Sequence, residues 1–228
     1  MNIAVASDDD FTRIHDHDTP TRLELRHVKA KNDAVIAIIE KMSGPCYVIR
    51  GGHGGKSGIS IGLRVFEMDS LVTDDQSRMH IRYKDGTYVE VGAGSEFQVE
   101  RIRFSSPNLL PSNRPEDRFD ETIFRFQSGI VRITAPEIHP LERFTIKTRS
   151  AIVQVTGPAD FYLIQLEKDR DLTVRVTKGK VALMNTVTNE TMPVPERTGA
   201  YQKVSGVVTG AGSFTDEQLT FLRSRTRI

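Results

Sequence analysis

The feature that most constrains the fold is a hairpin signal between residues 79 and 91. Two runs rich in apolar residues, Met79–Tyr83 and Tyr88–Val91, are joined through Lys84-Asp85-Gly86-Thr87. An Asp-Gly pair between β-forming runs favours a type I′ turn, in which both central residues take positive φ. Apolar and polar side chains alternate through the first run, which is typical of a strand with one face toward a core. We therefore predict a hairpin with Asp85 and Gly86 at its turn.

Short β-forming runs separated by turn signals continue along most of the chain. Further turn positions are predicted at Gly129, in Ser128-Gly129, at Gly157, in Thr156-Gly157-Pro158, and at Gly179, in Lys178-Gly179-Lys180. These signals favour strands because glycine supplies the backbone conformations that tight turns need. Strands are expected at residues 34–42, 46–50, 59–66, 79–83, 88–91, 123–134, 144–147, 151–155, 161–166, 172–177 and 181–184. We predict an all-β domain over residues 33–206, built of stacked short antiparallel strands as a twisted sandwich or a β-solenoid-like fold.

The C-terminal segment, residues 207–228, has a different pattern. Thr215-Asp216-Glu217-Gln218 fits a capping box, with acidic residues in the first turn and Arg223 and Arg225 in the last. One helix is therefore predicted over residues 215–225. Its apolar residues include Leu219 and Leu222, which we interpret as candidate partner-binding positions.

The N-terminal segment, residues 1–32, is polar and has no strong periodicity. We interpret it as an extended arm, because it holds too few apolar residues for a core of its own. Such an arm either is a tail without a partner or docks on another surface, for example by adding a strand to a sheet edge. Its candidate partner-binding residues are Ile3, Val5, Phe11, Ile14, Leu23 and Leu25.

Candidate chemical sites are few. His15 and His17 share one face of an extended segment and could bind a divalent metal ion, but we favour a solvated polar arm, because the segment has no visible scaffold to hold four ligands. The segment from Gly51 to Gly58 has a lysine and a serine after glycines, but its spacing and context differ from a phosphate-binding loop. Cys46 lies in an apolar run without a neighbouring base, and there is no G-x-S-x-G motif. We expect no catalytic residue and no cofactor.

Composition sets limits on partners and location. The chain has 228 residues, with 31 Lys and Arg against 30 Asp and Glu, so its net charge does not favour a polyanion such as nucleic acid. A single cysteine excludes an internal disulfide. The sequence shows neither a signal peptide nor an apolar window long enough to span a membrane. The chain therefore either stays in the compartment where it is made or is missing an export signal.

The order of these motifs resembles the FecR domain family, the iron-transport regulator type. The matching segment is MDSLVTDDQSRMHIRYKDGTYVEVGAGSEFQV, with Thr73, Ser77 and the Asp85-Gly86-Thr87 turn at the motif positions. Downstream, FRFQSGIVRI, FTIKTRSAIVQVTG and TVRVTKGKVALMN resemble the later segments of the family. The resemblance covers about residues 35–201. The sequence departs from the family pattern at Thr156-Gly157-Pro158, where the family usually has Arg-Gly-Thr. It implies an all-β architecture, while the anti-sigma segment and membrane helix of signalling members have no counterpart in the sequence.

These observations leave three functional hypotheses. The first is a non-catalytic protein–protein interaction or assembly module, a structural subunit of a larger complex such as a virion or a surface machine. The second is a periplasmic FecR-type signalling or envelope protein, and the third is an enzyme with an unrecognised site. We expect protein partners in a homo- or hetero-oligomer, with neither nucleic acid nor a membrane span.

Overall fold

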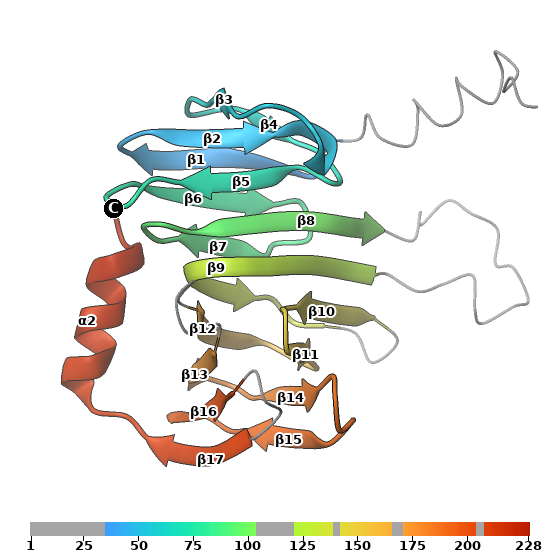
Figure 1. Ribbon diagram of the computed structural model, residues 1–228, viewed down its shortest axis with the longest axis vertical. Helices are drawn as coiled ribbons and strands as arrows, with labels where there is room; N and C mark the ends of the chain where they lie inside the picture. Colours follow the sequence, from blue (N-terminus) through green and yellow to red (C-terminus); the bar gives the residue numbers. More distant parts are fainter. Residues whose placement is uncertain (1–34, 104–120, 139–141, 166–170, 204–207) are drawn as a thin grey trace, which may run out of the picture. The chain divides into compact units, whose positions relative to one another are not determined.

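The computed structural model describes residues 35–103, 121–138, 142–165, 171–203 and 208–228. Ala34–Ile228 cluster as one compact unit, whose described part is shown in Figure 1. This described part holds 17 strands, one short 3-10 turn (η1, Arg50–Gly52) and one α-helix (α2, Asp216–Thr226). The predicted all-β fold with a single C-terminal helix is confirmed for the described residues.

The strands are short, apart from β9. Their bounds are β1 (Ala37–Ser43), β2 (Cys46–Ile49), β3 (Ser57–Gly58), β4 (Arg64–Val65), β5 (Ser70–Thr73), β6 (Arg78–Tyr83), β7 (Tyr88–Val91), β8 (Glu96–Arg103), β9 (Glu121–Ala135), β10 (Arg143–Lys147), β11 (Ala151–Val155), β12 (Ala159–Gln165), β13 (Leu172–Lys178), β14 (Val181–Asn185), β15 (Thr191–Val194), β16 (Thr198–Gln202) and β17 (Val208–Ser213).

The strands form two layers that share β9. One layer has the order β4-β1-β6-β7-β9-β12-β13-β16-β17. The other has the order β3-β2-β5-β8-β9-β10-β11-β14-β15. Neighbours are antiparallel except β9 and β10, which are parallel. Because the chain returns repeatedly from one layer to the other, the short strands stack as Figure 1 shows.

Strand β9 joins the two layers at Ser128 and Gly129. Its first part pairs with β8 and β10, and the part from Gly129 onward pairs with β7 and β12. Gly129 has φ +95°, and a Cβ there would lie 2.4 Å from the Cα of Ser95. The Ser95 hydroxyl accepts a hydrogen bond from the backbone N–H of Ile130 at 2.9 Å. The crossing therefore needs a glycine, for both its conformation and this close approach.

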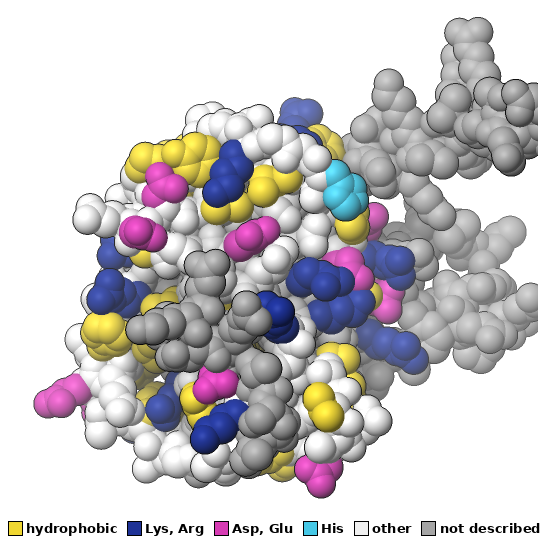
Figure 2. Space-filling view, viewed as in Figure 1, with side chains coloured by type: hydrophobic (Ala, Val, Ile, Leu, Met, Phe, Trp, Pro, Cys, Tyr) yellow, Lys and Arg dark blue, Asp and Glu magenta, His cyan; other side chains and the backbone are white. Residues whose placement is uncertain are grey.

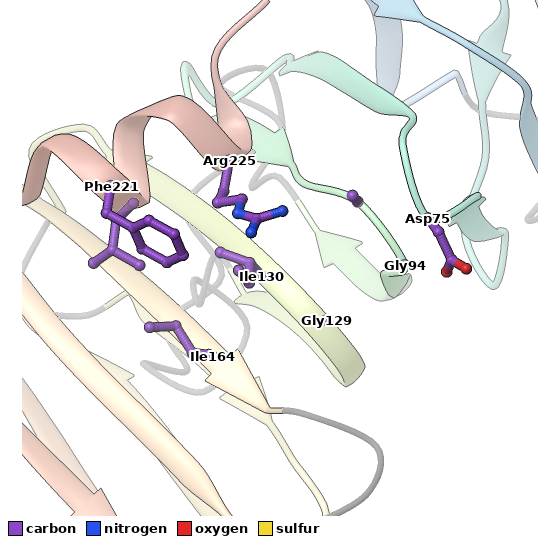
Figure 3. A pocket seen from close by; sticks show the side chains of 9 residues that line it. Asp75, Gly94, Gly129, Ile130, Ile164, Phe221 and Arg225 are labelled. Atoms are coloured by element: carbon purple, nitrogen blue, oxygen red, sulfur yellow. The ribbon is translucent and has the colours of Figure 1, made fainter. Parts of the chain in front are cut away.

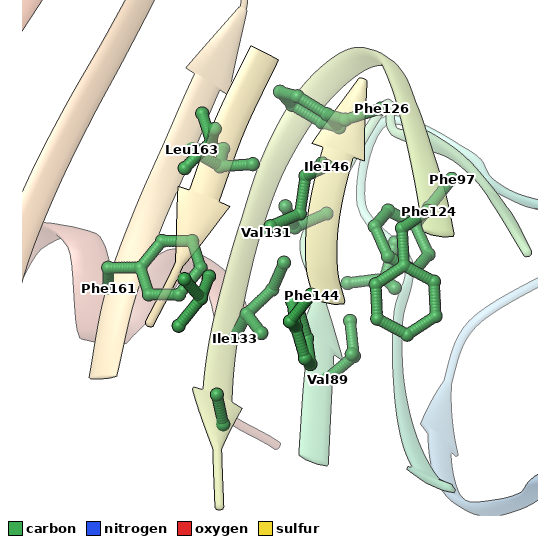
Figure 4. Close-up of a cluster of buried hydrophobic side chains, with 14 of the residues drawn as sticks. Val89, Phe97, Phe124, Phe126, Val131, Ile133, Phe144, Ile146, Phe161 and Leu163 are labelled. Carbon is green, nitrogen blue, oxygen red and sulfur yellow. The ribbon is translucent and has the colours of Figure 1, made fainter. Parts of the chain in front are cut away.

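The hydrophobic core lies between the two layers (Figure 4). The ring of Phe124 lies 4.9 Å from Tyr83, 5.1 Å from Phe97 and 5.5 Å from Phe144, measured between centroids. These aromatic residues come from β6, β8, β9 and β10, so the cluster ties both layers to the strand that joins them. Close packing of this kind supplies most of the favourable free energy of a fold.

The β6–β7 hairpin is present, but its predicted turn type is wrong. Gly86 has φ +88°, whereas Asp85 is not among the described residues with positive φ, so the turn is not type I′. The backbone N–H of Gly86 donates to Tyr83 O at 3.1 Å, and that of Tyr83 donates to Thr87 O at 2.9 Å. This is a three-residue loop, which needs positive φ only at its last residue. The Asp85 carboxylate instead accepts hydrogen bonds from Thr87 N and from the hydroxyl of Thr122 on β9.

The other predicted turn glycines occupy three different settings. Gly157 lies between β11 and β12, where an added Cβ would meet no atom within 4 Å. Gly179, with φ +77°, lies between β13 and β14, and a Cβ there would lie 2.2 Å from Pro158 O. Gly129 lies within β9, so the run predicted at 123–134 is one continuous strand.

Helix α2 begins with the predicted capping box. The Thr215 hydroxyl accepts from Gln218 N at 3.3 Å, and Gln218 Oε1 accepts from Thr215 N at 3.4 Å. The helix follows β17 and runs back along the outer face of the layer that contains β6, β7, β9 and β12 (Figure 1). This placement brings the last turn of the helix to strands more than 130 residues earlier in the chain.

Candidate partner-binding site at the C-terminal helix

A row of polar side chains crosses the outer face beneath α2. His80, Glu90, Arg132 and Tyr162 stand opposite one another on β6, β7, β9 and β12. The residues beside them in sequence point to the core, because successive side chains of a strand alternate between faces. The four side chains of the row therefore lie on the face of the sheet that points away from the core.

Arg132 is the centre of this row. Its Nε and Nη2 donate to the Asp160 carboxylate at 2.8 and 2.7 Å, and its Nη1 donates to Glu90 at 3.2 Å. The hydrogen bonds with Asp160 raise the pKa of Arg132 above its ordinary value, although burial acts in the opposite direction. Its guanidinium also lies 5.7 Å from the ring centroid of Tyr162. Such a bidentate, partly buried pair is among the stronger polar interactions in proteins, so it gives the face a fixed geometry.

The last turn of α2 is anchored on the sheet by three hydrogen bonds, two of them to the row. The Thr226 hydroxyl donates to Glu90 at 2.9 Å, the Nε2 of His80 lies 3.0 Å from Thr226 O, and Arg78 Nε donates to Arg225 O at 3.0 Å. A carbonyl can only accept, so Nε2 of His80 carries a proton, and Nδ1 of the ring lies 2.9 Å from the Tyr88 hydroxyl. These bonds satisfy carbonyls that a helix C-terminus otherwise leaves open.

The rest of α2 packs only thinly on the sheet. Leu222, 6% exposed, and Thr226 are its buried residues, and Leu219 is half-buried. Phe221 is 55% exposed. Of the two leucines proposed from the sequence as partner-binding positions, Leu222 faces the protein's own sheet. The aromatic side chain available to a partner is that of Phe221.

Two grooves flank the helix where it crosses β9 and β12. One has a volume of about 490 Å³ and lies between α2, the β7–β8 turn and β9 (Figure 3). The other, about 480 Å³, lies between α2 and strands β12 and β13. Both grooves are bordered by Ile164, Phe221 and Leu222, so they adjoin each other at the helix. We call the first of these the 225 groove, because Arg225 lines it.

Two candidate chemistries, a metal cluster and a reactive thiol, can be examined in the described residues. Within them, no group of three or more His, Cys, Asp and Glu side chains could hold a metal ion. Cys46 is buried, and burial together with Asp74 raises the pKa of its thiol to about 11. A thiol with such a pKa is almost entirely protonated at neutral pH and is a poor nucleophile. In the part of the chain that the structure covers, no helix is long and apolar enough to cross a membrane.

Several residues proposed from the sequence lie outside the described residues. They are the two histidines considered as metal ligands, His15 and His17, and the apolar residues of the N-terminal arm, Ile3, Val5, Phe11, Ile14, Leu23 and Leu25.

The family model for FecR protein matches residues 69–182, which is half of the chain. The chain belongs to the FecR family. In this FecR chain the matched region runs from just before β5 into β14, and it contains the whole polar row. Helix α2 lies beyond the matched region in sequence but packs on it in space.

Two solved structures are similar to this chain, and the one with a TM-score of 0.50 supports the fold. Both are crystal structures of a proposed anti-sigma factor from Parabacteroides distasonis ATCC 8503, 18% identical to the FecR chain, with TM-scores of 0.49 and 0.50. The match covers 66% of this chain, and it spans only 62% of that protein's length. A search of the curated proteins found no significant match. None of these comparisons supports a virion or structural subunit.

Sequence reasoning missed the polar row and the exposed aromatic ring of Phe221. The strand alternation placed His80 on the side opposite Met79, and the same rule applied to β7, β9 and β12 would have placed Glu90, Arg132 and Tyr162 outward. Their alignment depends on the register between strands, which no short-range pattern in the sequence reports.

Proposed function

We propose that this chain is a non-catalytic, FecR-type binding module of an envelope signalling system of the anti-sigma kind. The observation that carries the proposal is the FecR family match over residues 69–182, the region that holds the polar row and seats α2. The fold shared with a proposed anti-sigma factor agrees with it, at a TM-score of 0.50. In this proposal the FecR chain works by holding a protein rather than by transforming a substrate.

The structure supports a binding role in physical terms. The outer face carries a polar network fixed by Arg132, a thinly packed helix and an exposed aromatic side chain. Aromatic residues beside a groove are the positions where protein interfaces concentrate their binding free energy. On the face visible in Figure 2, acidic and basic side chains lie interspersed, which favours a local, specific partner over a polyanion.

The test is a gene deletion in the organism that encodes the chain. Transcript levels are compared among the wild type, the deletion strain, and the deletion strain carrying either the wild-type gene or a Gly129→Ala copy. The proposal predicts that a limited set of genes with a shared promoter type changes in the deletion strain. The wild-type copy should restore them, and the copy altered at the layer crossing should restore them poorly. Unchanged transcript levels would contradict a signalling role.

A further inference from the structure

We propose that the 225 groove binds a segment of a partner protein in which an apolar side chain lies next to a carboxylate. This inference rests on the proposed function, since it names the surface by which the FecR chain would hold a protein. The groove is lined by Asp75, Ala93, Gly94, Gly129, Ile130, Ile164, Phe221, Leu222 and Arg225.

The apolar part of the groove fits an inserted side chain. Ile130 and Ile164, paired across β9 and β12, form its floor, and Phe221 of α2 leans over them (Figure 3). A volume of about 490 Å³ can hold an aromatic or branched aliphatic side chain with its neighbouring backbone. Leaving a ring such as Phe221 55% exposed has a free-energy cost in water, which a docked apolar side chain would remove.

Glycines lie at three places around the groove: beneath the helix, in the β7–β8 turn and at the layer crossing. A Cβ on Gly92 would lie 2.8 Å from Arg225 O, so this glycine lets the last turn of α2 approach the sheet. Gly94 has φ +61° in the β7–β8 turn, and Gly129 has φ +95° at the layer crossing. At Gly94 and Gly129 the border of the groove is therefore formed by backbone without side chains.

Charge decides the chemistry of the partner. The Arg225 guanidinium lies 5.0 Å from the Phe221 ring centroid and makes no ion pair with a described carboxylate. Arg223 and Arg227 add exposed cations on the same end of the helix. Asp75 borders the far end of the groove, on the β5–β6 turn. An arginine stacked on an aromatic ring beside an apolar floor complements a carboxylate that follows an apolar residue, while Asp75 disfavours a second carboxylate there.

The test is selection from a displayed library of random 12-residue peptides on the full chain. The expected result is enrichment of peptides with an aromatic or large aliphatic residue next to Asp or Glu. Synthetic copies of the enriched peptides should bind at least about tenfold more weakly to the Phe221→Ala variant and to the Arg225→Gln variant. The first variant loses the aromatic contact, and the second loses the cation that pairs with the carboxylate of the peptide. Exchanging the carboxylate of the peptide for its amide should weaken binding to the wild type but not to Arg225→Gln.

Matched controls distinguish specific binding in the groove from non-specific binding elsewhere on the surface. Ile61→Ala removes another exposed apolar side chain, 62% exposed, and Arg64→Gln removes another exposed arginine on β4. Neither should change binding. The inference is overturned if no peptide is enriched, if enriched peptides lack the acidic residue, or if the control variants weaken binding as much as the groove variants. The peptide selection does not depend on signalling. It can therefore fail while the transcript experiment succeeds, and it can succeed while the transcript experiment fails.

Discussion

Replacing Thr226 by valine tests how α2 is held on the sheet. The Thr226 hydroxyl donates to Glu90 at 2.9 Å, and the two residues are 0% and 7% exposed. Valine keeps the shape of threonine and replaces the hydroxyl by a methyl group, which cannot donate to Glu90. A hydrogen bond to a charged group contributes about 1.5–3 kcal/mol. If α2 undocks locally, this loss makes the undocked state about 10- to 150-fold more populated.

The assay is amide hydrogen exchange of the full chain. Exchange at Leu222 and Arg223 should accelerate by that factor in Thr226→Val, while exchange at Val131 and Ile133 of β9 should change little. The matched control is Thr226→Ser, which keeps the hydroxyl and loses one methyl group, at a cost of about 0.8 kcal/mol. If serine accelerates helix exchange as much as valine, methyl packing rather than the bond to Glu90 anchors the helix, and the reasoning is refuted.

Three further predictions concern the body of the protein. Gly129→Ala should lower the free energy of unfolding by at least about 2 kcal/mol in urea titrations, because position 129 has positive φ and an added Cβ would contact Ser95. The control Gly157→Ala lies in open space and should change the free energy of unfolding by no more than about 0.5 kcal/mol. Equal effects of the two substitutions would contradict the crossing geometry. Burial by itself raises the pKa of Glu100, but its hydrogen bonds and charge interactions with Lys147 and Arg125 lower the pKa below the ordinary value. A lowered carboxyl pKa stabilises the fold above the unfolded pKa of about 4.3 and loses this contribution as pH falls through the folded pKa. The stability difference between wild type and Glu100→Gln should therefore be present at pH 7 and shrink toward pH 3; a constant difference would argue against these ion pairs. Cys46 should react with iodoacetamide at pH 8 at least about tenfold more slowly in the folded chain than in urea, and equal rates would contradict its burial.

Much of the fold can be predicted because local signals specify it. Alternation in Met79–Tyr83, the glycine at position 86 and the capping box at Thr215 each act over a few residues, and each marks the correct element. The turn type was wrong because Tyr83 lies opposite Thr87, which leaves three residues in the loop instead of the two of a type I′ turn, and no neighbouring residue reveals this strand register.

The candidate site could not be predicted in the same way. It combines α2 with strands β6 and β7, and the bond between Glu90 and Thr226 spans 136 positions in sequence. Leu222 and Phe221 are adjacent, and only the direction in which α2 lies on the sheet decides that the first is buried and the second exposed. Long-range placement of this kind depends on strand register and layer order rather than on local propensity.

The central claim of this account is that the FecR chain holds a partner protein at α2. Site-specific photo-crosslinking in the source cells tests this claim most directly. A photoreactive amino acid replaces Phe221 in one strain and Ile61, the exposed control position, in another. The account predicts one dominant cross-link from position 221, which mass spectrometry maps to an acidic, apolar segment of another protein, and which the Arg225→Gln change weakens. Cross-linking from position 221 that does not exceed that from position 61, or that maps to segments without this chemistry, would contradict it.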